Sequence, residues 1–188
     1  MLNNMVTASY SELVEIGTRI GIQIANEEVN RKKYEIIKHR RDKRLRNTKL
    51  LLENYLNFQE HIKSSIFDKR TVKENAIDIL DELDQFQTSE TAYIESIKQS
   101  CSRTAIIVEH VDKMIDIYQI LMKNSKLPED ERKYIILHKM YFQKNKLSVK
   151  DIAIQVNITE SQVYRNIKDS IDFLSSLIFG IDGIKVRI

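Results

Sequence analysis

The chain has 188 residues, of which 42% are hydrophobic and 30% are charged, and its formal net charge is only +3. A single cysteine excludes a disulfide framework within the chain, and no apolar stretch is long enough to span a bilayer. The first residues lack the basic start and the apolar core of a signal peptide. These totals predict a soluble, cytoplasmic protein without a membrane partner, in which the distribution of charge, not its sum, decides the choice of partner.

Helical patterns account for the chain up to residue 126. Ser9 and Glu12 have the spacing of a capping box, so we expect the first helix to begin there. Its apolar side chains recur at helical spacing, at Leu13, Ile16, Ile20 and Ile24. Gly17 and Gly21 lie beside this stripe, which predicts that another helix packs closely over the two glycines.

A strongly basic segment follows at residues 31–49, where ten Lys and Arg accompany only two acidic residues. Arg40, Arg41 and Arg44 within it are candidates for contacts with DNA phosphates. A later helix, opened by a capping box at Thr71 and Glu74, is acidic through residue 84. Pairing of the basic segment with this acidic helix, in the same molecule or in a dimer mate, explains the charges equally well. A basic face that is simply solvated is the third interpretation.

A heptad seam is expected between residues 94 and 122, where apolar side chains alternate steps of three and four. Coiled-coil dimerisation, which would make the protein a homodimer, and packing within a monomeric bundle fit this seam equally well. Cys101 lies on the seam with no neighbouring histidine, so we interpret it as a buried structural thiol.

Three shorter helices are predicted after residue 126. Pro128 suits the first turn of one helix, and the acidic residues 129–131 that follow it favour the positive end of that helix. Ser148 has the spacing of a cap for the next helix, and Asn157 tolerates the left-handed backbone that ends it. Thr159 and Gln162 form a capping box for the last helix.

The apolar pattern of the last two helices is typical of a DNA-binding helix-turn-helix. Ala153 is small enough for two backbones to approach, and Ile158 and Val163 fill the corner between the helices. The residues expected on the outer face of the last helix are polar or charged: Glu160, Ser161, Gln162, Tyr164, Arg165 and Lys168.

Gln162 and Arg165 have the side chains that bind adenine and guanine edges in two-pronged contacts, each worth roughly 1–3 kcal/mol of discrimination. Glu160 could accept a hydrogen bond from cytosine, but the preferred interpretation is that it is an acidic residue in the first turn of the helix, where the helix dipole favours negative charge. Phosphate contacts are expected from Lys146, Ser148 and Lys150 next to the second helix, and from Lys168. Packing of three helices without nucleic acid is the alternative interpretation of this segment.

Several segments carry a family resemblance. Residues 126–132 (KLPEDER), 147–153 (LSVKDIA) and 158–165 (ITESQVYR) resemble region four of bacterial sigma factors. Residues 177–183 (LIFGIDG) are similar to the ending of phage-encoded regulators of the ArpU and RinA type, and residues 42–55 resemble N-terminal segments of such proteins. The resemblance implies a phage or prophage activator of late or structural genes that contacts RNA polymerase in a bacterial host.

The sequence therefore predicts an all-α protein with a helical region at 1–126 and a sigma-region-four-like helix-turn-helix domain at 127–188. We expect a sequence-specific, double-stranded-DNA-binding transcription regulator. A helical adaptor that does not read DNA and a minimal sigma factor are the alternatives, although the chain has no Trp and its N-terminal half has no clustered aromatics for promoter melting. The four histidines are too widely spaced for a metal site and no phosphate-binding loop is present, so neither enzyme activity nor a cofactor is expected.

Overall fold

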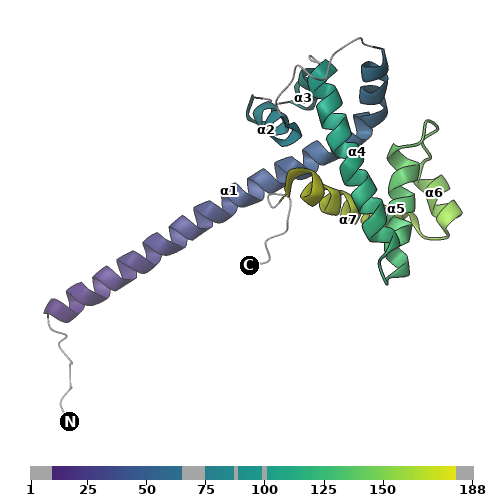
Figure 1. Ribbon diagram of the computed structural model, residues 1–188. Helices are drawn as coiled ribbons and strands as arrows, with labels where there is room; N and C mark the ends of the chain where they lie inside the picture. Colours follow the sequence, from purple (N-terminus) through teal and green to yellow (C-terminus); the bar gives the residue numbers. More distant parts are fainter. Residues whose placement is uncertain (1–9, 65–74, 87–88, 99–100, 181–188) are drawn as a thin grey trace. The chain divides into compact units, whose positions relative to one another are not determined.

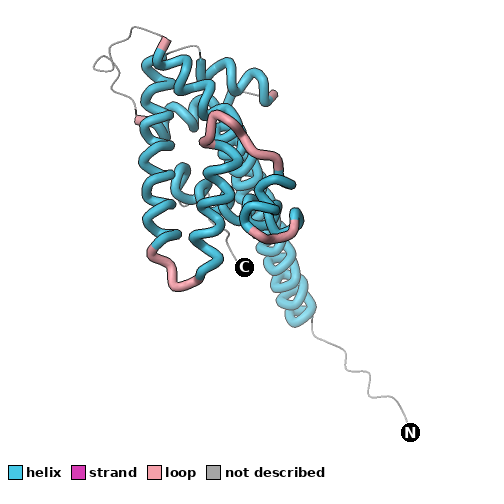
Figure 2. Tube along the Cα trace, turned by 90° about the vertical axis from the view of Figure 1, so that its right-hand side faces the viewer, coloured by secondary structure: helices cyan, strands magenta, loops and turns pink. Residues whose placement is uncertain are grey.

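The protein is all-α, as the sequence predicts. The computed structural model describes residues 10–64, 75–86, 89–98 and 101–180, and these ranges contain helices and connections but no strand (Figures 1 and 2). The helices are α1 (Tyr10–Lys63), α2 (Ala76–Phe86), α3 (Glu90–Lys98), α4 (Cys101–Lys123), α5 (Pro128–Tyr141), α6 (Val149–Val156) and α7 (Glu160–Phe179). None of them, over the part of the chain described, combines the length and hydropathy needed to cross a bilayer.

The chain divides into two compact units, and the boundary lies inside α1, between Arg40 and Arg41. It does not lie near residue 126, where the sequence places the domain boundary. The reason is that α4 packs on both α5 and α7, so the last three helices share one core with the helices before them. Tyr118 on α4, which is fully buried, donates a hydrogen bond to Ser170 on α7 at 2.8 Å.

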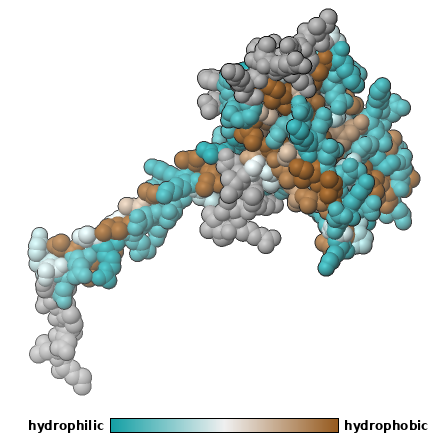
Figure 3. Space-filling view, in the orientation of Figure 1, coloured by the Kyte–Doolittle hydropathy of each residue, from teal (hydrophilic) through white to brown (hydrophobic). Residues whose placement is uncertain are grey.

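The unit that ends at Arg40 is described from Tyr10 onwards and consists of the first part of α1. Its side chains are exposed except that of Glu28, which is half-buried and pairs with Arg31 at 2.8 Å. Apolar and hydrophilic side chains alternate along its surface (Figure 3). No described atom outside the helix backbone lies within 4 Å of a Cβ built at Gly17 or Gly21, so the helix predicted to cover the two glycines is not found among the described residues.

The heptad seam lies inside the second unit. Its apolar members from Ile97 to Met122 are all buried, which shows that packing within the bundle accounts for the seam. The seam is divided between α3 and α4, and the hydroxyl of Thr104 donates to the carbonyl oxygen of Ile97 across that division at 2.5 Å. Cys101 is half-buried, and its thiol donates to the carbonyl oxygen of His61 at 3.7 Å.

The acidic helix begins at Ala76, later than the sequence indicates. Its cap is Asn75, whose side-chain oxygen accepts a hydrogen bond from the backbone N–H of Asp78 at 2.9 Å. The capping box predicted at Thr71 and Glu74 lies outside the described residues.

Candidate nucleic-acid interface

Local capping fixes where α6 and α7 begin, and both predicted caps are present. The Ser148 hydroxyl oxygen accepts from the backbone N–H of Asp151 at 3.2 Å. At the start of α7, Thr159 Oγ1 accepts from the backbone N–H of Gln162 at 3.2 Å, and Gln162 Oε1 accepts from the backbone N–H of Thr159 at 2.9 Å. Each start is therefore set by its own few residues, because these side chains satisfy backbone donors that have no partner inside the helix.

The turn between the two helices depends on a left-handed residue. Asn157 has φ 55° and ψ 53° and is the one non-glycine residue with positive φ in the described ranges. Immediately after it, the backbone N–H of Ile158 donates to the carbonyl oxygen of Ala153 at 3.0 Å, which closes the end of α6. Ala153 and Val163 are buried and Ile158 is half-buried, as the apolar pattern predicts for the corner between the helices.

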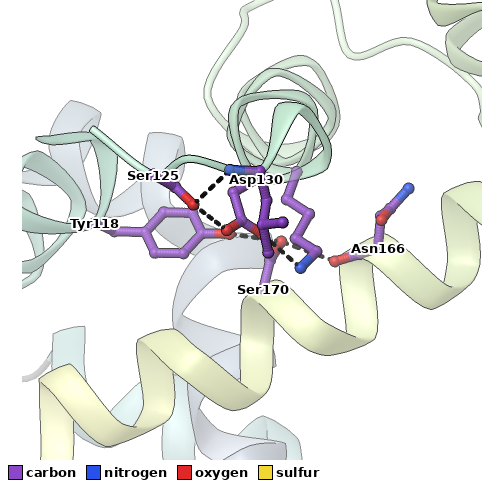
Figure 4. A network of polar contacts seen from close by, with 7 residues as sticks. Tyr118, Ser125, Asp130, Asn166 and Ser170 are labelled. Carbon is purple, nitrogen blue, oxygen red and sulfur yellow. Dashed lines mark hydrogen bonds and ion pairs between the residues drawn. The ribbon is translucent and has the colours of Figure 1, made fainter. Parts of the chain in front are cut away.

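A buried polar network fastens α7 to the helices behind it (Figure 4). The Ser170 hydroxyl accepts from Tyr118 and donates to the carbonyl oxygen of Asn166 at 2.7 Å. Burial raises the pKa of Tyr118 to about 12, so its phenol stays protonated and keeps donating at neutral pH.

The same network holds the start of α5. The carboxylate of Asp130 accepts from Lys133 at 2.8 Å and from the Ser125 hydroxyl at 2.6 Å, and these two hydrogen bonds lower the pKa of Asp130. The exposed face of α7 is thus carried by a helix whose opposite face has fixed polar and apolar partners.

The side chains predicted to read DNA bases lie together on the exposed face of the first turns of α7. They are the exposed residues Glu160, Ser161, Gln162, Tyr164, Arg165 and Lys168. Tyr164 is 61% exposed although it is aromatic, so it does not belong to the core.

Gln162 has a second role that the sequence analysis does not weigh against base contact. Its Oε1 accepts from both the backbone N–H and the hydroxyl of Thr159. A two-pronged contact with adenine needs this oxygen together with the amide nitrogen, so it competes with the capping box. Among the described residues, no hydrogen bond of Ser161 or Arg165 competes with base contact in this way.

The predicted phosphate contacts separate into different environments. Lys146, Ser148 and Lys150 are exposed near the start of α6, and the Lys146 ammonium donates to the carbonyl oxygen of Glu53 on α1 at 3.0 Å. Arg40 is exposed in the other compact unit, so no geometry links it to α7.

Arg41 and Arg44 are held by carboxylates of the same molecule. Arg41 pairs with Asp172 on α7 at 3.4 Å, and its side chain is 20% exposed. The Arg44 guanidinium is buried, pairs with Asp81 and lies 4.5 Å above the ring of Phe179. Arg44 is therefore not placed to contact DNA phosphates, because its guanidinium is buried and paired with Asp81 of the acidic helix α2.

A groove of about 850 Å³ lies beside α7 and includes two cations that the sequence analysis does not single out. Leu45, Met140 and Ile171 are among the apolar residues that line it, and Arg46 and Lys49 of α1 line it as well. Their positions three residues apart on one helix face, within a basic segment, are the sequence signal for these residues.

The groove also includes Tyr164 and Lys168, which belong to the exposed face of α7. No group of three or more His, Cys, Asp or Glu side chains suited to a metal ion occurs in the described ranges. No family model, curated protein or solved structure matches the chain.

Proposed function

We propose that the protein is a sequence-specific DNA-binding regulator of transcription, with α7 in the major groove. One observation carries the proposal: six polar or aromatic side chains are exposed on the first turns of a helix that follows a tight left-handed turn. In helix-turn-helix proteins the second helix reads base edges with its N-terminal residues, while the first helix contacts the backbone. Arg165 is suited to guanine, Ser161 to either type of base, and Lys150 to a phosphate.

The test is a double substitution on the exposed face, Arg165→Ala with Lys168→Ala. We expect affinity for duplex DNA to collapse, because one base contact and one phosphate contact are lost together. Helicity and melting temperature should stay unchanged, since both side chains are exposed. A matched control, Lys113→Ala with Lys123→Ala, removes the same charge from the exposed part of α4. Equal affinity of the first variant and the control would refute α7 as the reading helix.

The setting in transcription rests on the resemblance to sigma region four and to phage regulators. It favours an activator of phage or prophage promoters in the bacterial cytoplasm that contacts RNA polymerase. Run-off transcription with core polymerase distinguishes this from the minimal sigma factor. An activator gives no promoter-specific transcript with core enzyme alone, whereas a sigma factor does.

The first part of α1 favours a protein partner in addition to DNA. Leu13, Ile16, Ile20 and Ile24 are each at least half exposed, and they share one side of the helix. A second copy of the chain is the simplest partner, through this surface and not through the heptad seam, and a helical adaptor without DNA reading is the competing function. Light scattering after size exclusion tests this: wild type should have the mass of a dimer and Ile20→Glu that of a monomer.

A further inference from the structure

We propose that Arg46 and Lys49 of α1 hold a phosphate backbone of the same duplex that α7 enters, so that α1 and α7 contact the DNA together. The proposal rests on the function proposed above and names part of the DNA-binding surface that the helix-turn-helix alone does not supply. The observation behind it is that two cations of α1 share one groove with Tyr164 and Lys168 of α7.

Between residues 41 and 49, the part of the basic segment that shares a compact unit with α7, Arg46 and Lys49 are the cations that remain available. Arg41 is committed to Asp172, Arg44 is buried, and Lys43 is half-buried and has a partner of its own. Arg46 is exposed and has no partner among the described residues. Lys49 pairs with Glu53 at 3.6 Å, but both side chains are about half exposed. Such exposed pairs contribute little free energy, so the ammonium can exchange its partner for a phosphate.

Side-chain contacts join α1 to the last helices beside this groove, such as the pair of Arg41 with Asp172 of α7. The lining of the groove includes Leu45 of α1, Ile171 of α7 and Val149, the first residue of α6. Lys146, just before α6, is tied to α1 through the Glu53 carbonyl oxygen. Two acidic side chains also line the groove, but Asp172 is neutralised by Arg41 and Glu53 faces Lys49.

The position of Arg46 and Lys49 favours DNA over an acidic polypeptide as the occupant of the groove. A helix lying in the major groove has a sugar–phosphate strand on each side. Lys168 lies both on the exposed face of α7 and in the groove. A duplex that reaches Lys168 therefore brings one of its strands towards Arg46 and Lys49 of α1. The start of α6, with Ser148 and Lys150, adjoins the same groove through Val149. The proposal thus places Arg46 and Lys49 of α1 along the duplex together with Lys168 of α7.

The salt dependence of DNA binding tests the proposal. The probe is a mixed-sequence duplex of about 30 base pairs, titrated with the full chain at several salt concentrations. Log affinity falls as log salt rises, and each phosphate neutralised adds roughly 0.9 to the steepness of this fall. Arg46→Ala with Lys49→Ala should therefore reduce the steepness by about 1.8. Arg46→Lys should retain it, because the charge is kept, and Lys113→Ala with Lys123→Ala on α4 should not change it.

The outcomes separate this proposal from the proposed function. If Arg46→Ala with Lys49→Ala leaves the slope unchanged while Arg165→Ala still weakens binding, the α1 contact alone is overturned. The groove would then be a site for an acidic polypeptide. An equal fall in slope for the α4 control also overturns it, since net charge would then explain the effect. Failure of the wild-type chain to bind any duplex overturns both proposals.

Discussion

Substitutions at Arg44 separate a structural role of this guanidinium from a role in DNA binding. The Arg44 side chain is 7% exposed, pairs with Asp81 and lies 4.5 Å from the ring centre of Phe179. Alanine removes two buried methylenes, worth about 0.8 kcal/mol each, and the contact with the ring, worth about 1 kcal/mol. The pair with Asp81 adds less than about 1 kcal/mol, because that carboxylate is 42% exposed.

Arg44→Ala should therefore lower the free energy of unfolding by about 3 kcal/mol, which lowers Tm by about 6–12 °C in a chain of this size. Arg44→Met keeps most of the apolar stem, so it should recover more than half of that loss. Thermal unfolding followed by circular dichroism measures both, and DNA affinity is measured below the transition. An Arg44→Ala variant with unchanged Tm and weakened DNA binding would refute the buried structural role.

Three further predictions concern the helix-turn-helix and its support. Asn157→Gly should leave Tm nearly unchanged, whereas Asn157→Val should cost about 1–2 kcal/mol because its φ is 55°; equal stability of the two variants would contradict this. Thr159→Ala should cost about 1 kcal/mol through loss of the capping box, and an unchanged Tm would show that the cap is dispensable. The raised pKa of Tyr118, about 12, means that its contribution to stability is complete below about pH 10 and is lost as the pH rises through 12. Tyr118→Phe should therefore reduce the fall in Tm between pH 9 and pH 11, and an equal fall in both proteins would argue against it.

Short-range signals in the sequence predicted the last three helices well. Ser148, Asn157 and Thr159 act within a few residues of themselves, so spacing alone located the ends of α6 and the start of α7. The face of α7 followed from the same logic, since the apolar residues that point inward determine which residues point outward.

Long-range packing was harder to predict. The heptad seam did not reveal that α3 and α4 are separate helices, nor that the seam packs within one unit, because both depend on residues distant in sequence. Charge alone could not show that Arg44 is buried while Arg46 is exposed, since that depends on the neighbours of α1. At Gln162, by contrast, two local patterns compete, because the capping box and the outer-face pattern assign the same amide oxygen to different partners.

Selection of duplexes from a pool with a randomised centre tests most directly whether α7 reads DNA. Wild-type protein and Arg165→Ala are put through the same rounds, and the enriched sequences are compared. The wild type should enrich one motif that contains a guanine, and Arg165→Ala should lose preference at that position while its Tm stays the same. No enriched motif, or the same motif with both proteins, would contradict the assignment of α7 as the reading helix.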